Sequence, residues 1–236
     1  MSCLMPYAQG KGMVINMKSD LIQRILEQKI IAIVRGVYGE ECIRLAQALR
    51  DGGIKIVEVT FEQGKPERLM QTADTLRLLA DRFGSQMVFG AGTVTSIDML
   101  ELAEGAGARF VISPDINEEV IRRTVADGLV SIPGAMTPTE ILTAHRCGAD
   151  FVKVFPSSTL GATYIKAIRN PIPHVRLLAV GGVDENNISD FLEAGVSGVG
   201  VGGNLVNKKW IADGKFDKIT GLARRIVGNL RRETSN

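Results

Sequence analysis

Short continuous runs of apolar residues alternate with amphipathic stretches along most of this chain. Continuous rather than alternating runs are typical of strands covered on both faces, as in a parallel sheet. Eight such runs recur at intervals of roughly 20 to 32 residues. We predict strands over residues 30–34, 54–60, 87–93, 109–113, 129–132, 150–156, 176–180 and 196–201.

A stretch with apolar residues at helical spacing follows each run, and one more precedes the first run. Ser19, Ser96 and Asn117 stand where they can cap such helices, and Thr137-Pro138-Thr139-Glu140 is a helix-start pattern. We predict helices over residues 20–28, 40–50, 65–81, 96–104, 117–126, 137–146, 163–169, 185–193 and 216–230.

Eight strand–helix units in about 215 residues predict a (β/α)8 TIM barrel with an extra N-terminal helix. The alternative is an open doubly wound sheet. The barrel is preferred because apolar strands occur towards both ends of the chain without the features of an edge strand. No Ser/Pro-rich linker divides the chain, so residues 18–236 are predicted to form a single domain. Residues 1–17 are predicted to be a flexible N-terminal extension.

Composition narrows the class of protein. Of the 236 residues 45% are hydrophobic, which is enough for a substantial core, and the net charge is only +2. We expect no nucleic-acid partner, because no basic block is present. We expect no membrane association, because no apolar run approaches the ~20 residues of a membrane span. Three widely spaced cysteines indicate free thiols in a reducing cytoplasm, and two histidines are too few for a histidine-built metal site.

One lysine, Lys153, stands in the middle of a predicted buried strand, between Phe151 and Phe155. Burial disfavours the ammonium form, so a buried lysine loses its proton more readily and becomes a nucleophile towards carbonyl groups. The structural alternative is a lysine near a strand end that reaches water or pairs with an acid.

Further polar residues fall near the carboxyl ends of the predicted strands, where barrel enzymes place their chemistry. Arg35 ends the first strand, and Glu58 lies on the second. Thr93 follows two glycines on the third. Glu58 and Lys153 are either a structural ion pair or a Schiff-base lysine with a carboxylate that moves protons. Arg35 is a candidate ligand for a carboxylate or a phosphate, and Thr93 a candidate hydrogen-bond donor.

Glycine pairs follow the last two predicted strands, Gly181-Gly182 and Gly202-Gly203, and Asn204 follows the second pair. Barrels often bind phosphate in these two loops through exposed main-chain N–H groups. The alternative is that the glycines only permit tight turns. We expect a phosphate-binding site.

Eight stretches together resemble the family of 2-keto-3-deoxy-6-phosphogluconate (KDPG) and 4-hydroxy-2-oxoglutarate (KHG) aldolases. They occur in family order and spacing over nearly the whole chain from about residue 20. The stretches are Ile-Ala-Ile-Val-Arg (31–35), Val-Glu-Val-Thr-Phe (57–61), Gly-Ala-Gly-Thr-Val (90–94), Ile-Ser-Pro (112–114), Pro-Gly-Ala-Met-Thr-Pro-Thr-Glu (133–140), Lys-Val-Phe-Pro (153–156), Gly-Gly-Val (181–183) and Gly-Val-Gly-Gly (200–203). The segments around Lys153 and Gly181 also resemble the related phosphogalactonate (KDPGal) aldolase.

The resemblance implies a class I aldolase that needs neither metal nor cofactor and is usually a homotrimer. It implies cleavage of a phosphorylated keto acid, KDPG, to pyruvate and glyceraldehyde 3-phosphate. The residue roles carried over are the Schiff-base lysine (Lys153), the general acid/base (Glu58), a pyruvate contact (Thr93), a pocket wall (Phe155), and the phosphate loops (Gly181, Gly182, Gly202 and Gly203). Pro114 and Asn204 are further candidate substrate contacts.

Two departures from the family pattern concern the substrate. Many members carry an arginine shortly after the Glu-Val-Thr segment that binds the pyruvate carboxylate, whereas this chain has Glu62 there. We hypothesise that Arg35 takes that role. Ala179-Val180 replaces a common Pro-Thr pair. The C4 epimer of the substrate is therefore open, and the alternatives are KDPGal aldolase, KHG aldolase and a catalytically silent phosphosugar-binding barrel.

Overall fold

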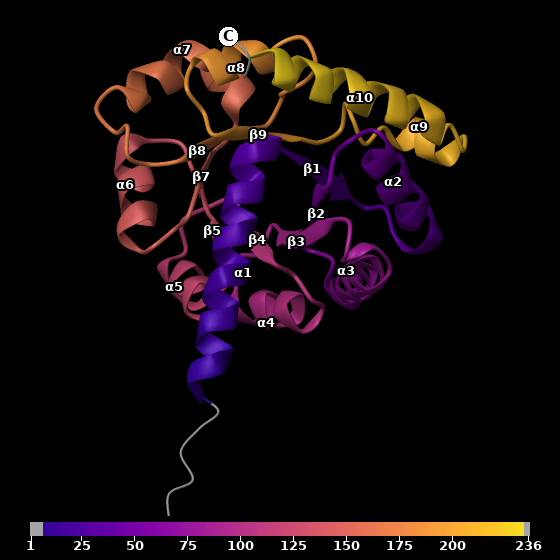
Figure 1. Cartoon of the computed structure of the whole chain (residues 1–236), viewed down its shortest axis with the longest axis horizontal. Coiled ribbons are helices and arrows are strands. Elements are labelled where there is room, and N and C mark those ends of the chain that lie inside the picture. Colours follow the sequence, from indigo (N-terminus) through magenta and orange to yellow (C-terminus); the bar gives the residue numbers. More distant parts are fainter. Residues whose placement is uncertain (1–6, 234–236) are drawn as a thin grey trace, which may run out of the picture.

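A ring of parallel strands surrounded by helices forms the body of the molecule (Figure 1). The computed structural model describes residues 7–233, with the side chains of residues 17–230. The strands are β1 (Ile30–Arg35), β2 (Ile56–Thr60), β3 (Val88–Gly92), β4 (Phe110–Ile112), β5 (Val130–Ile132), β6 (Gly134–Ala135), β7 (Val152–Val154), β8 (Leu177–Val180) and β9 (Gly198–Val201).

The sheet closes through one interrupted strand. Its order is β5-β4-β3-β2-β1-β9-β8-β7-β6, with every pair parallel. β5 pairs with β4 and β6 pairs with β7, and only Pro133 separates β5 from β6. The Lys153 N–H donates to Pro133 O at 2.8 Å, and the Phe151 N–H donates to Ser131 O at 3.2 Å, so β7 follows both pieces. The nine segments are thus the eight strands of the predicted TIM barrel.

Helices alternate with the strands and cover the outside of the ring (Figure 1). They are α1 (Tyr7–Gln28), α2 (Gly39–Asp51), the 3-10 helix η1 (Pro66–Arg68), α3 (Leu69–Phe83), α4 (Ile97–Gly105), α5 (Glu118–Ala126), α6 (Pro138–Arg146), α7 (Ser157–Arg169), α8 (Ile188–Glu193), α9 (Lys208–Ala212) and α10 (Phe216–Glu233). None of the helices in residues 7–233 combines the length and apolarity of a membrane span.

Two apolar cores follow from this arrangement. The larger core lies between the strands and the surrounding helices. The smaller one fills the barrel interior with side chains such as Phe110, Ile132 and Phe151. Leu21 and Ile25 of α1 belong to this inner core, so α1 closes the end of the barrel at which the strands begin. The opposite end, where the strands terminate, is left open for chemistry.

The first helix differs from the prediction. It begins at Tyr7 rather than Asp20, so residues 7–17 of the predicted extension are helical, and Ser19 lies within the helix instead of capping it. Residues 1–6 of that extension lie outside the described residues, and its flexibility stays a prediction.

Two other helices differ as well. The range of α7 starts at Ser157, but Gly161 (φ 78°) is not helical, so this range joins a first turn from Ser157 to a helix after the kink that corresponds to the predicted helix over 163–169. The short helix α9 was not predicted, although Asn207 caps it by accepting a hydrogen bond from the Trp210 N–H.

Candidate active site

A cavity of about 920 Å³ opens at the carboxyl ends of the strands. All eleven residues that the sequence singles out for catalysis or substrate binding line it. They are Arg35, Glu58, Thr93, Pro114, Lys153, Phe155, Gly181, Gly182, Gly202, Gly203 and Asn204. The parallel barrel brings these residues together from seven different strands or the loops that follow them, which spacing in the sequence alone does not show.

Lys153 and Glu58 are the two buried charged residues of the cavity, 7% and 2% exposed. Lys153 lies at the centre of β7, and its Nζ is 4.8 Å from the centre of the Phe155 ring. Glu58 lies at the centre of β2, and its Oε2 has no hydrogen-bond partner among the described residues. An unsatisfied buried carboxylate oxygen is costly in a folded protein and points to a ligand or water as its partner.

Glycines on β3 make room for this acid. Gly92 lies beside Glu58, and a Cβ at position 92 would overlap the Glu58 carboxyl group. Gly90 pairs with Glu58 in the sheet register, and a Cβ there would collide with the Phe110 ring. Gly92 is therefore required by the Glu58 carboxyl group, and Gly90 by the Phe110 ring beneath it.

Burial shifts both titratable groups towards their neutral forms. Desolvation lowers the pKa of the Lys153 ammonium; the nearby Glu58 charge opposes this effect and Arg35 adds to it. Desolvation likewise raises the pKa of the Glu58 carboxyl, against the opposing influence of Lys153 and Arg35. A lowered pKa suits an amine nucleophile, and a raised pKa suits a carboxyl group that carries protons near neutral pH.

Arg35 and Thr93 lie together at the mouth of the cavity. The Arg35 guanidinium donates to Thr93 Oγ1 at 3.5 Å. Thr93 adopts a left-handed backbone with φ 59°, a conformation that is unfavourable for a β-branched residue and that concentrates at functional sites. The Gln63 side chain donates to Thr93 O at 2.8 Å and helps to hold this conformation.

The two glycine loops follow β8 and β9, and β9 pairs with β1, so the second loop lies next to the end of β1 that carries Arg35. Gly181 and Gly182 have φ angles of 93° and 74°, which require glycine, and a Cβ on Gly182 would overlap Ser158 Oγ. The Gly182 carbonyl accepts a hydrogen bond from Asn187 at 2.8 Å. Asn204, after the second loop, donates to Asp184 at 3.4 Å. These contacts hold in place the two loops that are predicted to bind phosphate.

Several residues that line the cavity were not predicted from the sequence. Lys208 and Lys209, at the start of α9, are exposed and contribute two cations to its wall. Lys208 Nζ lies 3.2 Å from where a Cβ on Gly36 would be, on the β1 side of the mouth. Asn207, a helix-cap residue, was the available signal that a helix begins there. The remaining wall is mainly apolar, from residues such as Ile33, Val180 and Val206.

Glu62, the residue at which this sequence departs from the family pattern that it resembles, is held in a cluster of polar side chains. Its carboxylate accepts hydrogen bonds at 2.6 Å from each of Tyr38, Lys65 and Arg68. These donors, Lys65 foremost, lower the pKa of Glu62 to about 2. The Glu62 carboxylate is thus paired with three neighbouring donors, and an acid at this position cannot bind a substrate carboxylate through opposite charges.

Within residues 17–230, no cluster of three or more His, Cys, Asp or Glu side chains could hold a metal ion. What the cavity does offer is a desolvated amine, a buried carboxyl group, cations at its mouth and glycine loops. This set can form an imine with a keto acid, move protons at the bound carbon skeleton and hold an anionic tail.

Comparison with known proteins agrees with this chemistry. Residues 21–222 match the family model described as KDPG and KHG aldolase. The 2-dehydro-3-deoxy-6-phosphogalactonate aldolase of Escherichia coli is 35% identical over 177 residues, covering 75% of this chain and 83% of that protein.

Two solved structures share the fold over most of their length. A native KDPGal structure has a TM-score of 0.79 at 31% identity, covering 88% of this chain and 96% of its own. The KDPG aldolase of Legionella pneumophila, with pyruvate captured at low pH as a covalent carbinolamine intermediate, has a TM-score of 0.76 at 28% identity, covering 84% and 94%. With the family model matching most of its length, this chain belongs to the KDPG and KHG aldolase family, and it is a lyase of the aldolase type.

Proposed function

We propose that this protein is a class I aldolase that cleaves a 6-phosphorylated 2-keto-3-deoxy sugar acid, with KDPG as the first candidate, to pyruvate and glyceraldehyde 3-phosphate. The observation that carries the proposal is the burial of Lys153, 7% exposed, in one cavity with Glu58, 2% exposed. A protein that only bound phosphosugars would not need a desolvated amine beside a desolvated acid.

In the proposed reaction the neutral Lys153 amine adds to the C2 ketone of the substrate, and loss of water gives a protonated imine. The imine accepts the electron pair of the C3–C4 bond as that bond breaks, and the C4 hydroxyl proton passes to Glu58 through a water. This releases the aldehyde and leaves an enamine. Protonation of the enamine at C3 and hydrolysis of the imine release pyruvate and restore the amine.

We assign the two anionic ends of the substrate to two different sets of residues in the cavity wall. Arg35, with Thr93, binds the pyruvate carboxylate through charge-assisted hydrogen bonds. Phe155 and Pro114 line the substrate path between the two ends. The phosphate is bound by the main chain at Gly181, Gly182, Gly202 and Gly203, by Asn204, and by the cations Lys208 and Lys209.

A second candidate is the C4 epimer, KDPGal. It is favoured by the 35% identity to a phosphogalactonate aldolase and by Ala179-Val180, which leaves no side-chain hydroxyl at these two positions. Values of kcat/KM for gluconate-derived and galactonate-derived keto acids, each with and without the phosphate, decide between the candidates. Preference for an unphosphorylated 4-hydroxy-2-oxoglutarate over both phosphorylated epimers would overturn the proposal in favour of KHG cleavage.

We also propose that the protein acts in the cytoplasm as a homotrimer, as the family resemblance implies. Light scattering coupled to size exclusion tests the assembly. The expected mass is about three times the 25.5 kDa of one chain, and a monomeric mass would contradict it.

A further inference from the structure

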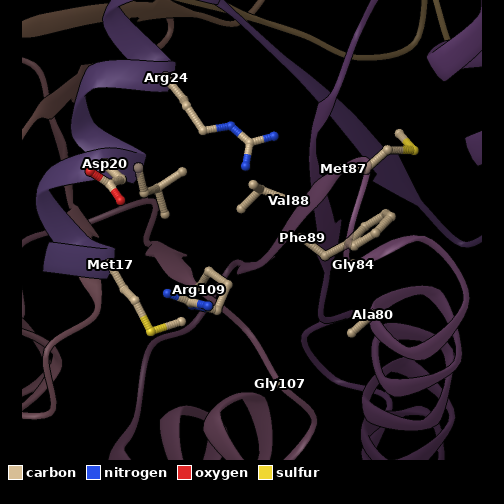
Figure 2. A pocket seen from close by; sticks show the side chains of 11 residues that line it. Met17, Asp20, Arg24, Ala80, Gly84, Met87, Val88, Phe89, Gly107 and Arg109 are labelled. Atoms are coloured by element: carbon tan, nitrogen blue, oxygen red, sulfur yellow. The ribbon is translucent and has the colours of Figure 1, made fainter. Parts of the chain in front are cut away.

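A second pocket, of about 330 Å³, lies near the end of the barrel at which the strands begin, away from the candidate active site (Figure 2). Its walls come from α1, the carboxyl end of α3, the start of β3 and the residue before β4. Its size falls at the lower end of the range for small-molecule sites. Nothing in the aldolase reaction uses this pocket.

Two arginines face the pocket from different elements. Arg24 extends from α1 towards β3, and Arg109 extends from the start of β4 towards α1 (Figure 2). Both side chains are partly buried, and neither has a hydrogen-bond or ion-pair partner among the described residues. The pocket therefore contains two guanidinium groups that make no hydrogen bond or ion pair within the part of the chain that the structure describes.

The other partly buried arginines show that this is unusual for the molecule. Arg50 and Arg68 each donate to a carboxylate at 3.0 Å or less, and Arg169 donates to two main-chain carbonyls at 3.2 Å. Partly buried guanidinium groups are ordinarily paired in this way because their desolvation is otherwise uncompensated. Two arginines in a single pocket, neither paired with any side chain of residues 17–230, point to an anion that does not come from this part of the chain.

The rest of the pocket limits the kind of anion. Leu21 and Val88, both of the inner core, give part of its wall an apolar surface, which favours a ligand with a hydrocarbon portion over a bare inorganic ion. Asp20 also lines the pocket, but it is exposed and makes no ion pair with Arg24 one helical turn away, so it does not neutralise the arginines.

We propose that this pocket is a binding site for a small organic dianion, of the size of a short dicarboxylate, whose two charged groups bind Arg24 and Arg109. Planar guanidinium groups bind carboxylates through paired hydrogen bonds, and a hydrocarbon chain between the carboxylates covers Val88 and its neighbours. The proposal is independent of the aldolase assignment, since it involves no residue of the candidate active site.

Succinate is the test ligand, and backbone amide NMR shifts of the full-length protein locate its binding. We expect saturable shifts at the amides of residues 21–24 and 87–89, with a common dissociation constant. Arg24→Met and Arg109→Met should each weaken binding at this site by about tenfold or more, because each removes a charge-assisted contact. Succinamide, which has a similar shape without charge, should produce no saturable shift there.

The matched control is Arg82→Met, an exposed arginine on α3 that does not line the pocket, and its dissociation constant should stay within about twofold of the parent value. Asp20→Asn should tighten binding modestly, since a like charge is removed. Arg24→Lys, which keeps the charge and the fold but loses the paired geometry, should bind with intermediate affinity.

Two results would overturn the proposal. One is the absence of saturable shifts at these amides up to about 20 mM succinate, a range that covers weakly held metabolites. The other is unchanged affinity in both Arg24→Met and Arg109→Met. If inorganic phosphate bound at least as tightly as succinate, the site would be a simple phosphate site and the dicarboxylate assignment would be wrong.

Discussion

Burying the charged groups of Lys153 and Glu58 reduces the stability of the fold, and packing alone gives no reason for placing them there. Replacing such a pair by apolar residues of similar volume is often neutral or stabilising in other proteins. The Glu58 Oε2 atom has no partner among the described residues, and Gly92 is needed to accommodate the carboxyl group. At the scale of single residues, these features are best explained by chemistry at this position.

The pKa of Lys153 leads to a prediction about pH. Burial lowers this pKa below its ordinary value of 10.5, so the reactive neutral amine becomes populated at lower pH than in an exposed lysine. We expect the rate of imine formation with pyruvate to rise with pH through a midpoint below 10.5. Glu58→Gln removes the charge that favours the ammonium, so the midpoint should move to still lower pH.

The same Glu58→Gln variant should lose about 10²- to 10⁴-fold in kcat, because it removes a proton carrier. Steady-state and stopped-flow kinetics over a pH series measure both effects. A midpoint that moved upward in the variant would show that Glu58 does not interact with the amine as described.

Arg35 provides a prediction about substrate binding. Arg35→Ala should weaken pyruvate binding, measured by imine formation at equilibrium, by about tenfold or more, because a charge-assisted contact to the carboxylate is lost. Arg77→Ala, which alters an exposed arginine paired with Asp74 on α3, serves as the control. Undiminished imine formation in Arg35→Ala would show that another residue binds the carboxylate.

Glu62 provides a prediction about stability. Its pKa of about 2 means that its interactions with Lys65, Tyr38 and Arg68 stabilise the folded state above the unfolded-state pKa near 4.5. That contribution falls as pH decreases from there towards 2. Glu62→Gln should lower the free energy of unfolding at neutral pH by about 1 kcal/mol, with the difference shrinking in acid.

Urea titrations at a series of pH values measure this difference. A constant difference between the parent protein and Glu62→Gln from pH 7 to pH 2 would contradict the assigned pKa.

At the scale of elements, α1 is part of the barrel core, because Leu21 and Ile25 pack among the inward-facing side chains of the strands. Ile25 is 1% exposed. Ile25→Ala should therefore reduce the free energy of unfolding by about 2–5 kcal/mol, as for other large-to-small changes in a core. Gln23→Ala, on the exposed face of the same helix, should change it by less than about 0.5 kcal/mol. Equal effects of the two variants would show that α1 does not close the barrel.

Elements with strong local signals could be predicted from the sequence. Ser96 and Asn117 cap α4 and α5, and Thr137 with Glu140 forms a capping box on α6. The turn from Ser157 to Gly161 was not predicted, whereas the helix after Gly161 was, because the backbone leaves the helical conformation at this glycine. The start of α1 was also missed, since Gly10 and Gly12 lie in its first turns.

The residues of the candidate site could also be predicted, because they too have local signals in the sequence. Glycine pairs, a lysine inside an apolar strand and an acid on a neighbouring strand are unusual locally, so they stand out in a linear sequence. Lys208 and Lys209 were not predictable, because two lysines in a loop resemble ordinary surface residues. Only the curvature of the barrel brings them to the cavity.

At the scale of the whole molecule, the two ends of the barrel have different tasks. α1 closes the end where the strands begin, and the open end holds the amine, the acid and the glycine loops. This division is general for barrels of this kind. An imine serves as the electron sink in the proposed reaction, so dialysis against a chelator should leave kcat unchanged. A loss of activity restored by a divalent cation would instead indicate a metal-dependent aldolase.

The central claim is that Lys153 forms the covalent bond to the keto acid. Borohydride reduction in the presence of pyruvate, followed by peptide mass spectrometry, tests it most directly. We predict a pyruvate-derived mass increase on the peptide containing Lys153, its loss in Lys153→Arg, and its retention in Lys166→Arg, a matched change on the exposed face of α7. A label on another lysine, or an undiminished label in Lys153→Arg, would contradict the account.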